Sequence, residues 1–353
     1  MKHTPRSRHP HDTLQTTLRA AFALDRRRLT VLAALVLAII QARTVVLYTL
    51  KNHVALPGTR AVRYQRLLRF VRFAVPDGLY THVVLKLLPP GDLWLILDRT
   101  NWKLGQHDIN ILLLSASWQS FSFPLLWTLL PHGGSSHQRD RITLLERFLD
   151  LRGDREVAGL LADREFVGET WFTFLRQNGI TPCIRLKASS RVNGIPVRAC
   201  FTHLCPGELR VWHRPVVVYG VRLRVLATRN TGGEVLYLAY SGQAKQNLHR
   251  YAARWNTENL FAALKSRGFN LEDTGLTHAT RVSTLLLVVS LAFVWACLTG
   301  AVLVMREGVR RKAHGYAAVS VFRLGLDALQ DLLLHPSTSS WRSLAALMPR
   351  FDQ

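Results

Sequence analysis

Apolar and polar positions in residues 1–90 follow a helical pattern. Residues 30–50 form an apolar stretch that opens Thr-Val-Leu-Ala-Ala-Leu-Val-Leu, and it predicts a buried helix too short to cross a bilayer comfortably. Beyond Pro57-Gly58, a second helical segment carries a cation at every third position. Each step of three residues falls about 60° short of a full helical turn, so these cations form a ribbon that winds slowly around the helix. The ribbon consists of Arg60, Arg63, Arg66, Arg69 and Arg72.

From residue 91 the pattern changes to short apolar runs, which predict strands. The predicted order is strand, strand, strand, helix, strand, helix, strand, and this order indicates an α/β domain. The strands are expected at residues 93–97, 109–114, 121–130, 157–162 and 182–186, and the helices at residues 139–151 and 169–177.

Residues 188–245 interrupt this scheme. Val and Ile alternate with Arg, and turn signals occur at Asn193-Gly194, at Pro206-Gly207 and at Thr231-Gly232-Gly233. This pattern predicts several antiparallel strands, and sheet is expected to resume at residues 235–238.

Residues 251–265 contain no Gly or Pro and are rich in good helix formers, so we expect one continuous helix. At about 100° per residue, four polar side chains share an arc of roughly 60°. These are Tyr251, Arg254, Glu258 and Lys265, while Ala253, Leu260 and Leu264 lie on the opposite face. For an isolated amphipathic helix, a solvated face with ordinary ion pairs is the simpler interpretation.

Residues 282–305 contain no charged side chain, so length and hydropathy make them a candidate membrane span. Basic residues flank both ends, which leaves little topogenic asymmetry, and α/β domains need long apolar helices in their cores. We therefore expect a core helix and no membrane association. Residues 305–353 are expected to form a C-terminal helical region with an amphipathic helix at 319–334.

The net charge of the chain indicates what kind of partner it binds. The chain has 46 Lys and Arg against 23 Asp and Glu, a net charge of +23, which favours a polyanion and above all nucleic acid. The basic ribbon is then expected to contact phosphates, with a merely solvated face as the alternative, and residues 1–90 become a helical DNA-binding domain. Four cysteines without a pairing pattern, and no secretory signal, indicate the cytoplasm. A zinc site formed by Cys200, Cys205, His203 and His213 would have non-standard spacing.

Three carboxylates are candidates for chemistry. Asp98 and Asp163 each end an apolar run, and Glu258 lies on the predicted helix. Such a set in a basic chain suits divalent cations that keep open positions for phosphate oxygens. Two such ions can activate a water or a 3′-hydroxyl and stabilise the leaving oxygen.

The spacing Tyr251-x2-Arg254-x3-Glu258-x6-Lys265 matches the Tyr-Arg-Glu-Lys signature of the insertion-sequence-four family of bacterial DDE transposases. The chain also resembles that family around its first Asp, in the segment from Asp98 to Lys103, and around its second, in the segment from Leu160 to Phe166. A β-rich insertion before the helix with the Glu is typical of the family.

The resemblance implies an RNase H-like catalytic core in two parts, residues 91–187 and 246–304, interrupted by the β-strand insertion at 188–245. In that fold the first and fourth strands are neighbours, so Asp98 and Asp163 would meet. The three acids would bind two Mg²⁺ ions, with Mn²⁺ as a substitute. Tyr251, Arg254 and Lys265 would hold phosphates near the cleaved end. Trp255 would stack on an unpaired base or pack in the core, and Trp212 is a second stacking candidate.

The implied activity is cut-and-paste transposition: cleavage of the ends of double-stranded transposon DNA, through a hairpin, and strand transfer into target DNA. Pairing of two ends implies a homodimer in the synaptic complex. Three alternatives stay open at this level: a catalytically silent DNA-binding inhibitor of transposition, an RNase H-like structure-specific nuclease, and a basic membrane protein anchored by residues 282–305.

Overall fold

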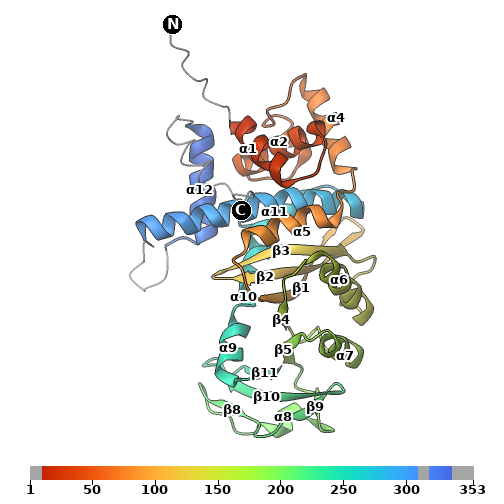
Figure 1. Cartoon of the computed structure of the whole chain (residues 1–353), viewed down its shortest axis with the longest axis vertical. Coiled ribbons are helices and arrows are strands. Elements are labelled where there is room, and N and C mark those ends of the chain that lie inside the picture. The colour runs from red at the N-terminus through yellow and green to blue at the C-terminus, as the bar shows by residue number, and fades with distance from the viewer. Residues whose placement is uncertain (1–9, 309–317, 336–353) are drawn as a thin grey trace. The chain divides into compact units, whose positions relative to one another are not determined.

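The apolar runs of residues 93–186 assemble into the first half of one large sheet (Figure 1). The computed structural model describes residues 10–308 and 318–335. Strand β1 pairs in parallel with β4, and β4 pairs in parallel with β5, whereas β2 and β3 form an antiparallel hairpin. The strand order here is β3-β2-β1-β4-β5. The strands are β1 (Leu93–Leu104), β2 (His107–Trp118), β3 (Phe121–Leu129), β4 (Val157–Ala162) and β5 (Thr181–Leu186).

Two helices lie where the sequence predicted them, at residues 139–151 and 169–177. Helix α6 (Gln138–Leu151) connects β3 to β4, and helix α7 (Glu169–Gln177) connects β4 to β5. The two helices contact each other, and α6 packs on β3 while α7 packs on β5 (Figure 1). The predicted order of strands and helices, and the pairing of the first strand with the fourth, are therefore confirmed.

The close pairing of β1 with β4 depends on a small residue. Trp94 on β1 lies opposite Gly159 on β4, and a Cβ at Gly159 would meet the Trp94 ring at 2.5 Å. Only a glycine leaves room for the indole at this position. The register brings Leu97 opposite Ala162, at the point where the candidate acids follow.

The expected antiparallel strands of residues 188–245 are present, and they extend the same sheet. Strand β11 pairs with β5 on one side and with β10 on the other, so the order continues β5-β11-β10-β9-β6-β7, with β8 beside β10. The insertion is thus continuous with the core through β11. Its elements are β6 (Arg191–Val192), β7 (Ile195–Pro196), α8 (Val197–Cys200), β8 (Leu209–Val211), β9 (Val216–Val218), β10 (Val221–Arg229) and β11 (Val235–Tyr240).

By packing, the chain divides into two units. The sheet unit comprises Pro90–Lys103 and Asp108–Asn259; the helical unit comprises Met1–Pro89, Leu104–His107 and Leu260–Gln353. Residues 260–304, which we expected in the catalytic core, therefore group with the N-terminal helices. Of the expected C-terminal region, residues 309–317 and 336–353 lie outside the described residues. The elements of the helical unit are α1 (Pro10–Ala21), α2 (Arg26–Ala42), α3 (Leu47–Leu50), α4 (Arg60–Val71), α5 (Asp77–Leu87), η1 (Leu271–Asp273), α11 (Ala279–Glu307) and α12 (Val321–Leu334).

The apolar stretch at residues 30–50 is two helices, so the expectation of a single helix was wrong. Helix α2 ends at Ala42 because Arg43 adopts a left-handed conformation, with φ 52°, and its N–H closes on the Ile39 carbonyl. This is a common way for a helix to end. A short helix, α3, follows.

Helix α11 lies in the core of the helical unit. It packs against α2, α4 and α12, and its close approach to α12 requires glycines, because a Cβ at Gly300 or Gly325 would collide with the facing backbone. By length and composition alone, α11 could cross a membrane, but 72% of its most apolar window is buried inside the protein. That burial is typical of a core helix.

Candidate active site

Two of the candidate acids lie where the pairing of β1 with β4 ends. The parallel pairing stops at Leu97 and Ala162, and Asp98 and Asp163 are the next residues along the chain. Asp163 ends its strand as expected. Asp98 does not, because β1 continues to Leu104 in its hairpin with β2, so the prediction that Asp98 lies at a strand end was wrong.

The predicted helix over residues 251–265 is two helices, which corrects the single-helix stripe. Helix α9 (Ala244–Ala252) ends before Ala253, and helix α10 (Trp255–Leu264) begins after Arg254. Around the break, backbone N–H groups bond to carbonyls three residues back, as in Arg254 to Tyr251 and Thr257 to Arg254. Such bonds tighten the turn and re-aim the side chains that follow. Leu260 and Leu264 are buried, as the pattern predicted.

Arg254, at this break, joins two of the acids. Its guanidinium donates from Nη1 to Asp98 Oδ2 at 3.2 Å and from Nη2 to Glu258 Oε1 at 2.6 Å. The side chains of Arg254 and Asp98 are 12% and 15% exposed, whereas Glu258 is 38% exposed. One cation thus holds a strand carboxylate and a helix carboxylate together, in a partly desolvated place where charge interactions are strong.

Asp163 has a cation of its own. Arg185 on β5 lies 3.7 Å from Asp163 Oδ1 and forms a 2.5 Å ion pair with Glu234. Oδ1 of Asp163 is buried and accepts no hydrogen bond. An orphaned carboxylate oxygen beside two further carboxylates is the donor chemistry that hard divalent cations prefer. The residues therefore fit a Mg²⁺ site, although Asp98, Asp163 and Glu258 are not a group whose ligand atoms all lie within 4.8 Å of one another.

The ionisation of the site reflects its burial. Burial raises the pKa of the Asp98 carboxyl to about 6, against the opposing effects of the Arg99 N–H and the Arg254 guanidinium, and the charges of Asp163 and Glu258 raise it further. Burial also disfavours the charge of Arg254, but Tyr251 and Asp98 outweigh it and raise the pKa of the guanidinium. Acidic neighbours that oppose one another's ionisation are common in sites that bind cations.

The other residues singled out in the sequence lie in different environments. Tyr251 is 8% exposed and packs with Ile96 and Leu161, and burial raises the pKa of its phenol. Trp255 is 59% exposed, so the core-packing alternative for it was wrong. Trp212 is 36% exposed and packs edge-on against Phe201.

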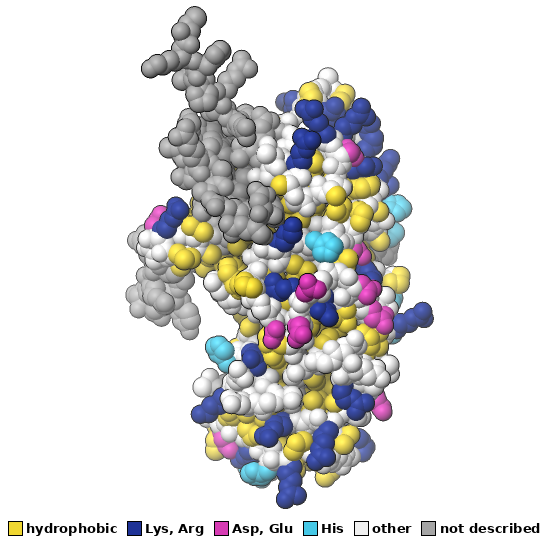
Figure 2. Space-filling view, viewed as in Figure 1, with side chains coloured by type: hydrophobic (Ala, Val, Ile, Leu, Met, Phe, Trp, Pro, Cys, Tyr) yellow, Lys and Arg dark blue, Asp and Glu magenta, His cyan; other side chains and the backbone are white. Residues whose placement is uncertain are grey.

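In the helical unit, Lys265 follows α10 and pairs with Glu272 at 2.8 Å. The basic ribbon lies on α4, and Figure 2 shows Lys and Arg gathered over this part of the visible face. Arg60 and Arg69 are exposed, whereas Arg63 and Arg66 are half-buried. Arg66 donates to the Pro57 carbonyl and Arg69 to that of Gln65.

A buried polar network that sequence reasoning missed lies next to Asp98. Arg99 makes two hydrogen bonds to Glu165, at 2.9 and 3.2 Å, and Glu165 also accepts from the backbone of Ser136. Arg141 donates hydrogen bonds to the backbone carbonyls of Ser136 and Glu165. The sequence signal that could have revealed this network is the position of its members beside the candidate acids. Arg99 follows Asp98 directly, and Glu165 lies two residues after Asp163. By contrast, Cys200, Cys205, His203 and His213 do not gather into a metal site in the described chain.

Comparison with known proteins identifies the family of the chain. Residues 90–295 match the Transposase DDE domain family, and this match spans more than half of the chain. No curated protein matches. Among solved structures, a piggyBac transposase synaptic complex with hairpin DNA is similar at 11% identity and TM-score 0.47, over 92% of this chain and 77% of that one. Endonuclease V from Bacillus subtilis is similar at 10% identity and TM-score 0.26, over 61% of this chain and 87% of that one.

Proposed function

Because this chain belongs to the Transposase DDE domain family, we propose that it is a DNA transposase that cuts transposon ends and joins them to target DNA. The observation that carries the proposal is the bridge from Arg254 to Asp98 and Glu258. It brings together acids that are distant in the sequence, and Asp163 follows the strand next to Asp98. The spacing from Tyr251 to Lys265 further supports membership of the insertion-sequence-four group.

We assign the catalytic core to an RNase H-like fold. The parallel pairing of β1 with β4, and the order of strands and helices from β1 to β5, support this assignment. In this scheme residues 1–90 bind DNA, and residues 188–245 form the insertion.

The catalytic residues are Asp98, Asp163 and Glu258. These side chains would hold two Mg²⁺ ions, which Mn²⁺ could replace, and bound ions would supply an activated hydroxyl and stabilise the leaving oxygen. Asp98 lies on β1, Asp163 directly follows the neighbouring strand β4, and Glu258 lies in the first turn of α10. Arg254 and Arg185 balance their negative charge, which limits the repulsion that would otherwise push the acids apart.

The DNA-contacting residues are basic or exposed. Lys265 and the arginines of α4 are assigned to phosphates, and exposed Trp255 is assigned to an unpaired base at the cleaved end. Arg254 contacts phosphate from its place between the acids. Tyr251 supports it, because its buried ring lies 5.8 Å from the Arg254 guanidinium.

The net charge of +23 supports double-stranded DNA as the partner, both the transposon ends and the target. Joining two ends requires two active sites, so we propose a homodimer in the synaptic complex and cytoplasmic action on the chromosome. A hairpin at each transposon end is part of the same proposal.

The decisive experiment is cleavage of a duplex that carries the element's own terminal repeat, in Mg²⁺. We compare the wild-type protein with Glu258→Gln, which keeps the size of the side chain but removes its charge. Glu146→Gln is the matched control, because Glu146 is an exposed carboxylate on α6 and is not one of the three acids. We expect cleavage by the wild type and the control, and none by Glu258→Gln with end binding retained.

Other outcomes select other functions. End binding without cleavage by any variant indicates a silent inhibitor of transposition. Cleavage that depends on DNA structure and ignores the terminal sequence indicates a nuclease. Equal cleavage by Glu258→Gln and the wild type refutes the role of Glu258. A denaturing gel of the end product detects the hairpin as a strand of double length.

A further inference from the structure

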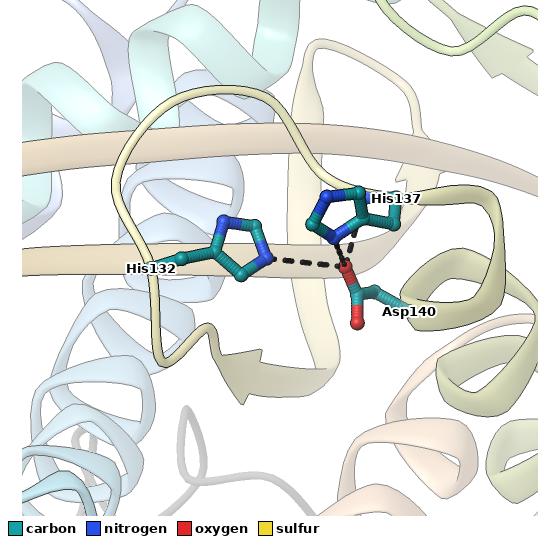
Figure 3. A group of neighbouring side chains, drawn as sticks. All are labelled: His132, His137 and Asp140. Atoms are coloured by element: carbon teal, nitrogen blue, oxygen red, sulfur yellow. Dashed lines mark hydrogen bonds and ion pairs between the residues drawn. The ribbon is translucent and has the colours of Figure 1, made fainter.

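Two histidines and an aspartate gather beside the loop between β3 and α6. His132 and His137 belong to this loop, and Asp140 lies in the first turn of α6 (Figure 3). Asp140 Oδ2 is 3.5 Å from His132 Nε2 and 3.3 Å from His137 Nδ1. One ligand atom from each residue lies within 4.8 Å of the other two. This group is separate from Asp98, Asp163 and Glu258, and the proposed reaction does not use it.

The hydrogen bonding of His132 leaves a lone pair inside the group. Nδ1 of His132 lies 3.0 Å from the Gly133 carbonyl, which can only accept, so this nitrogen carries the proton. In the neutral ring Nε2 then has no proton. It is buried, it has no hydrogen-bond partner, and it faces an oxygen of Asp140. Two lone pairs that face each other at this distance repel, and a metal ion between them would turn the repulsion into two bonds.

The spacing of the atoms indicates a metal ion. Zinc binds imidazole nitrogen and carboxylate oxygen at about 2.0–2.1 Å, so neighbouring ligands of a tetrahedral site lie about 3.3 Å apart. The two distances to Asp140 Oδ2 agree with that edge, and zinc at His137 would replace the capping contact in which the His137 side chain accepts the Asp140 N–H. The bond from His132 Nδ1 to a backbone carbonyl is also the usual support for a metal-binding histidine. We propose that His132, His137 and Asp140 bind one zinc ion, with a fourth position open to water.

The chemistry of the ligands selects zinc over the Mg²⁺ assigned to the acids. Mg²⁺ prefers oxygen ligands and keeps its waters, whereas imidazole suits zinc and similar transition metals. The positive end of the α6 dipole opposes a cation, but this effect is small compared with the coordination of zinc by two imidazoles and a carboxylate. Asp140 also accepts the His137 N–H at 2.8 Å, which holds its carboxylate in place.

Such an ion would fix the loop that supports the first catalytic strand. Between His132 and His137 lies Ser136, whose N–H donates to Glu165 at 3.1 Å. Glu165 holds Arg99, and the Arg99 N–H donates to Asp98 at 2.8 Å. The three zinc ligands are therefore positioning residues for Asp98 and take no part in the reaction itself.

The test is zinc binding by the full chain. After removal of metals, the protein is dialysed against Zn²⁺ in excess Mg²⁺, and bound zinc is measured by atomic emission. We expect about one zinc per wild-type chain, and binding at least about tenfold weaker for His132→Ala, His137→Ala and Asp140→Asn. Asp140→Asn keeps an oxygen that can accept the His137 N–H, so it separates loss of zinc from loss of the helix cap. Co²⁺ added in place of zinc should give the visible spectrum of a tetrahedral site.

Two controls make the result specific. His213→Ala should keep its zinc, and loss of zinc in this variant but not in His132→Ala would place the ion elsewhere. Glu258→Gln should lose cleavage but keep zinc, so failure of the zinc site and failure of the proposed function give different results. If the wild type binds no zinc, or if His132→Ala binds as tightly as the wild type, the proposal is wrong and a protonated His132 accounts for the contact. Circular dichroism shows whether each variant is folded.

Discussion

The guanidinium of Arg254 lies 3.2 Å from the carboxylate of Asp98, although 156 residues separate the two along the chain. The same guanidinium holds Glu258, so removal of its charge leaves two partly buried carboxylates without their shared cation. We expect Arg254→Gln to lower the free energy of unfolding in metal-free buffer by about 3 kcal/mol. Added Mg²⁺ should restore part of this loss, because a dication can replace the missing charge.

Thermal or urea unfolding with and without Mg²⁺ measures this effect. Arg222→Gln is the matched control, since Arg222 is exposed on β10, and it should change stability by less than about 0.5 kcal/mol. An Arg254→Gln protein as stable as the wild type in both buffers would show that the bridge does not hold the acids.

Trp255 should contribute to binding and not to folding. Its side chain is 59% exposed, so Trp255→Ala should leave the unfolding free energy nearly unchanged. Loss of one stacked base costs about 1–3 kcal/mol, or roughly 5- to 150-fold in affinity for an end duplex with an unpaired base. Fluorescence anisotropy measures the affinity. Trp171→Ala is the contrasting variant. The indole of Trp171 on α7 is fully buried, so its removal should destabilise the fold. If Trp255→Ala binds the end duplex as tightly as the wild type, the exposed side chain of Trp255 does not contribute to binding.

The exposed arginines of α4 should give binding a strong dependence on salt. Arg60→Gln and Arg69→Gln should each lower the affinity for any duplex and reduce the slope of log affinity against log salt by about 1. Arg176→Gln, at an exposed position on α7, serves as the control. Identical slopes for the wild type and the α4 variants would favour the solvated-face interpretation of the ribbon.

The cysteines should differ in reactivity because thiolates are the reactive form. Burial raises the pKa of the Cys183 thiol to about 12, and burial also raises that of Cys297, so neither is ionised at about pH 8. Cys205 is exposed. A thiol reagent should therefore label Cys205 first, in a phase that Cys205→Ser removes. Cys183 and Cys297 are buried and should react only after unfolding, so their labelling should follow the loss of structure as urea is added. Rapid labelling of Cys183 would contradict its burial.

Local patterns predicted much of the sheet unit. The runs before Asp98 and Asp163 are buried strands, and the helices predicted at residues 139–151 and 169–177 are α6 and α7, because side-chain burial follows the periodicity of each element. The arrangement of Asp98 beside Asp163 came from resemblance to a family, since no local rule states which strands pair.

Features that depend on contacts between distant residues were not predictable. The break at Ala253 and Arg254 was missed because residues 251–265 have strong helix propensity, and tertiary contacts override propensity. The extension of β1 beyond Asp98 depends on its partner strand β2, and the ion pair of Arg185 with Asp163 depends on β5 lying next to β4.

The position of β11 decides how this protein can be re-engineered. Since β11 lies between β5 and β10, the segment 188–245 is not a removable cassette. A clean excision would strip the outer neighbour from β5 and expose a strand edge on which other copies could assemble. A miniaturised enzyme would have to keep Val235–Tyr240 and join it to β5 by a tight hairpin, and a graft from another transposase would have to bring its own equivalent of that strand.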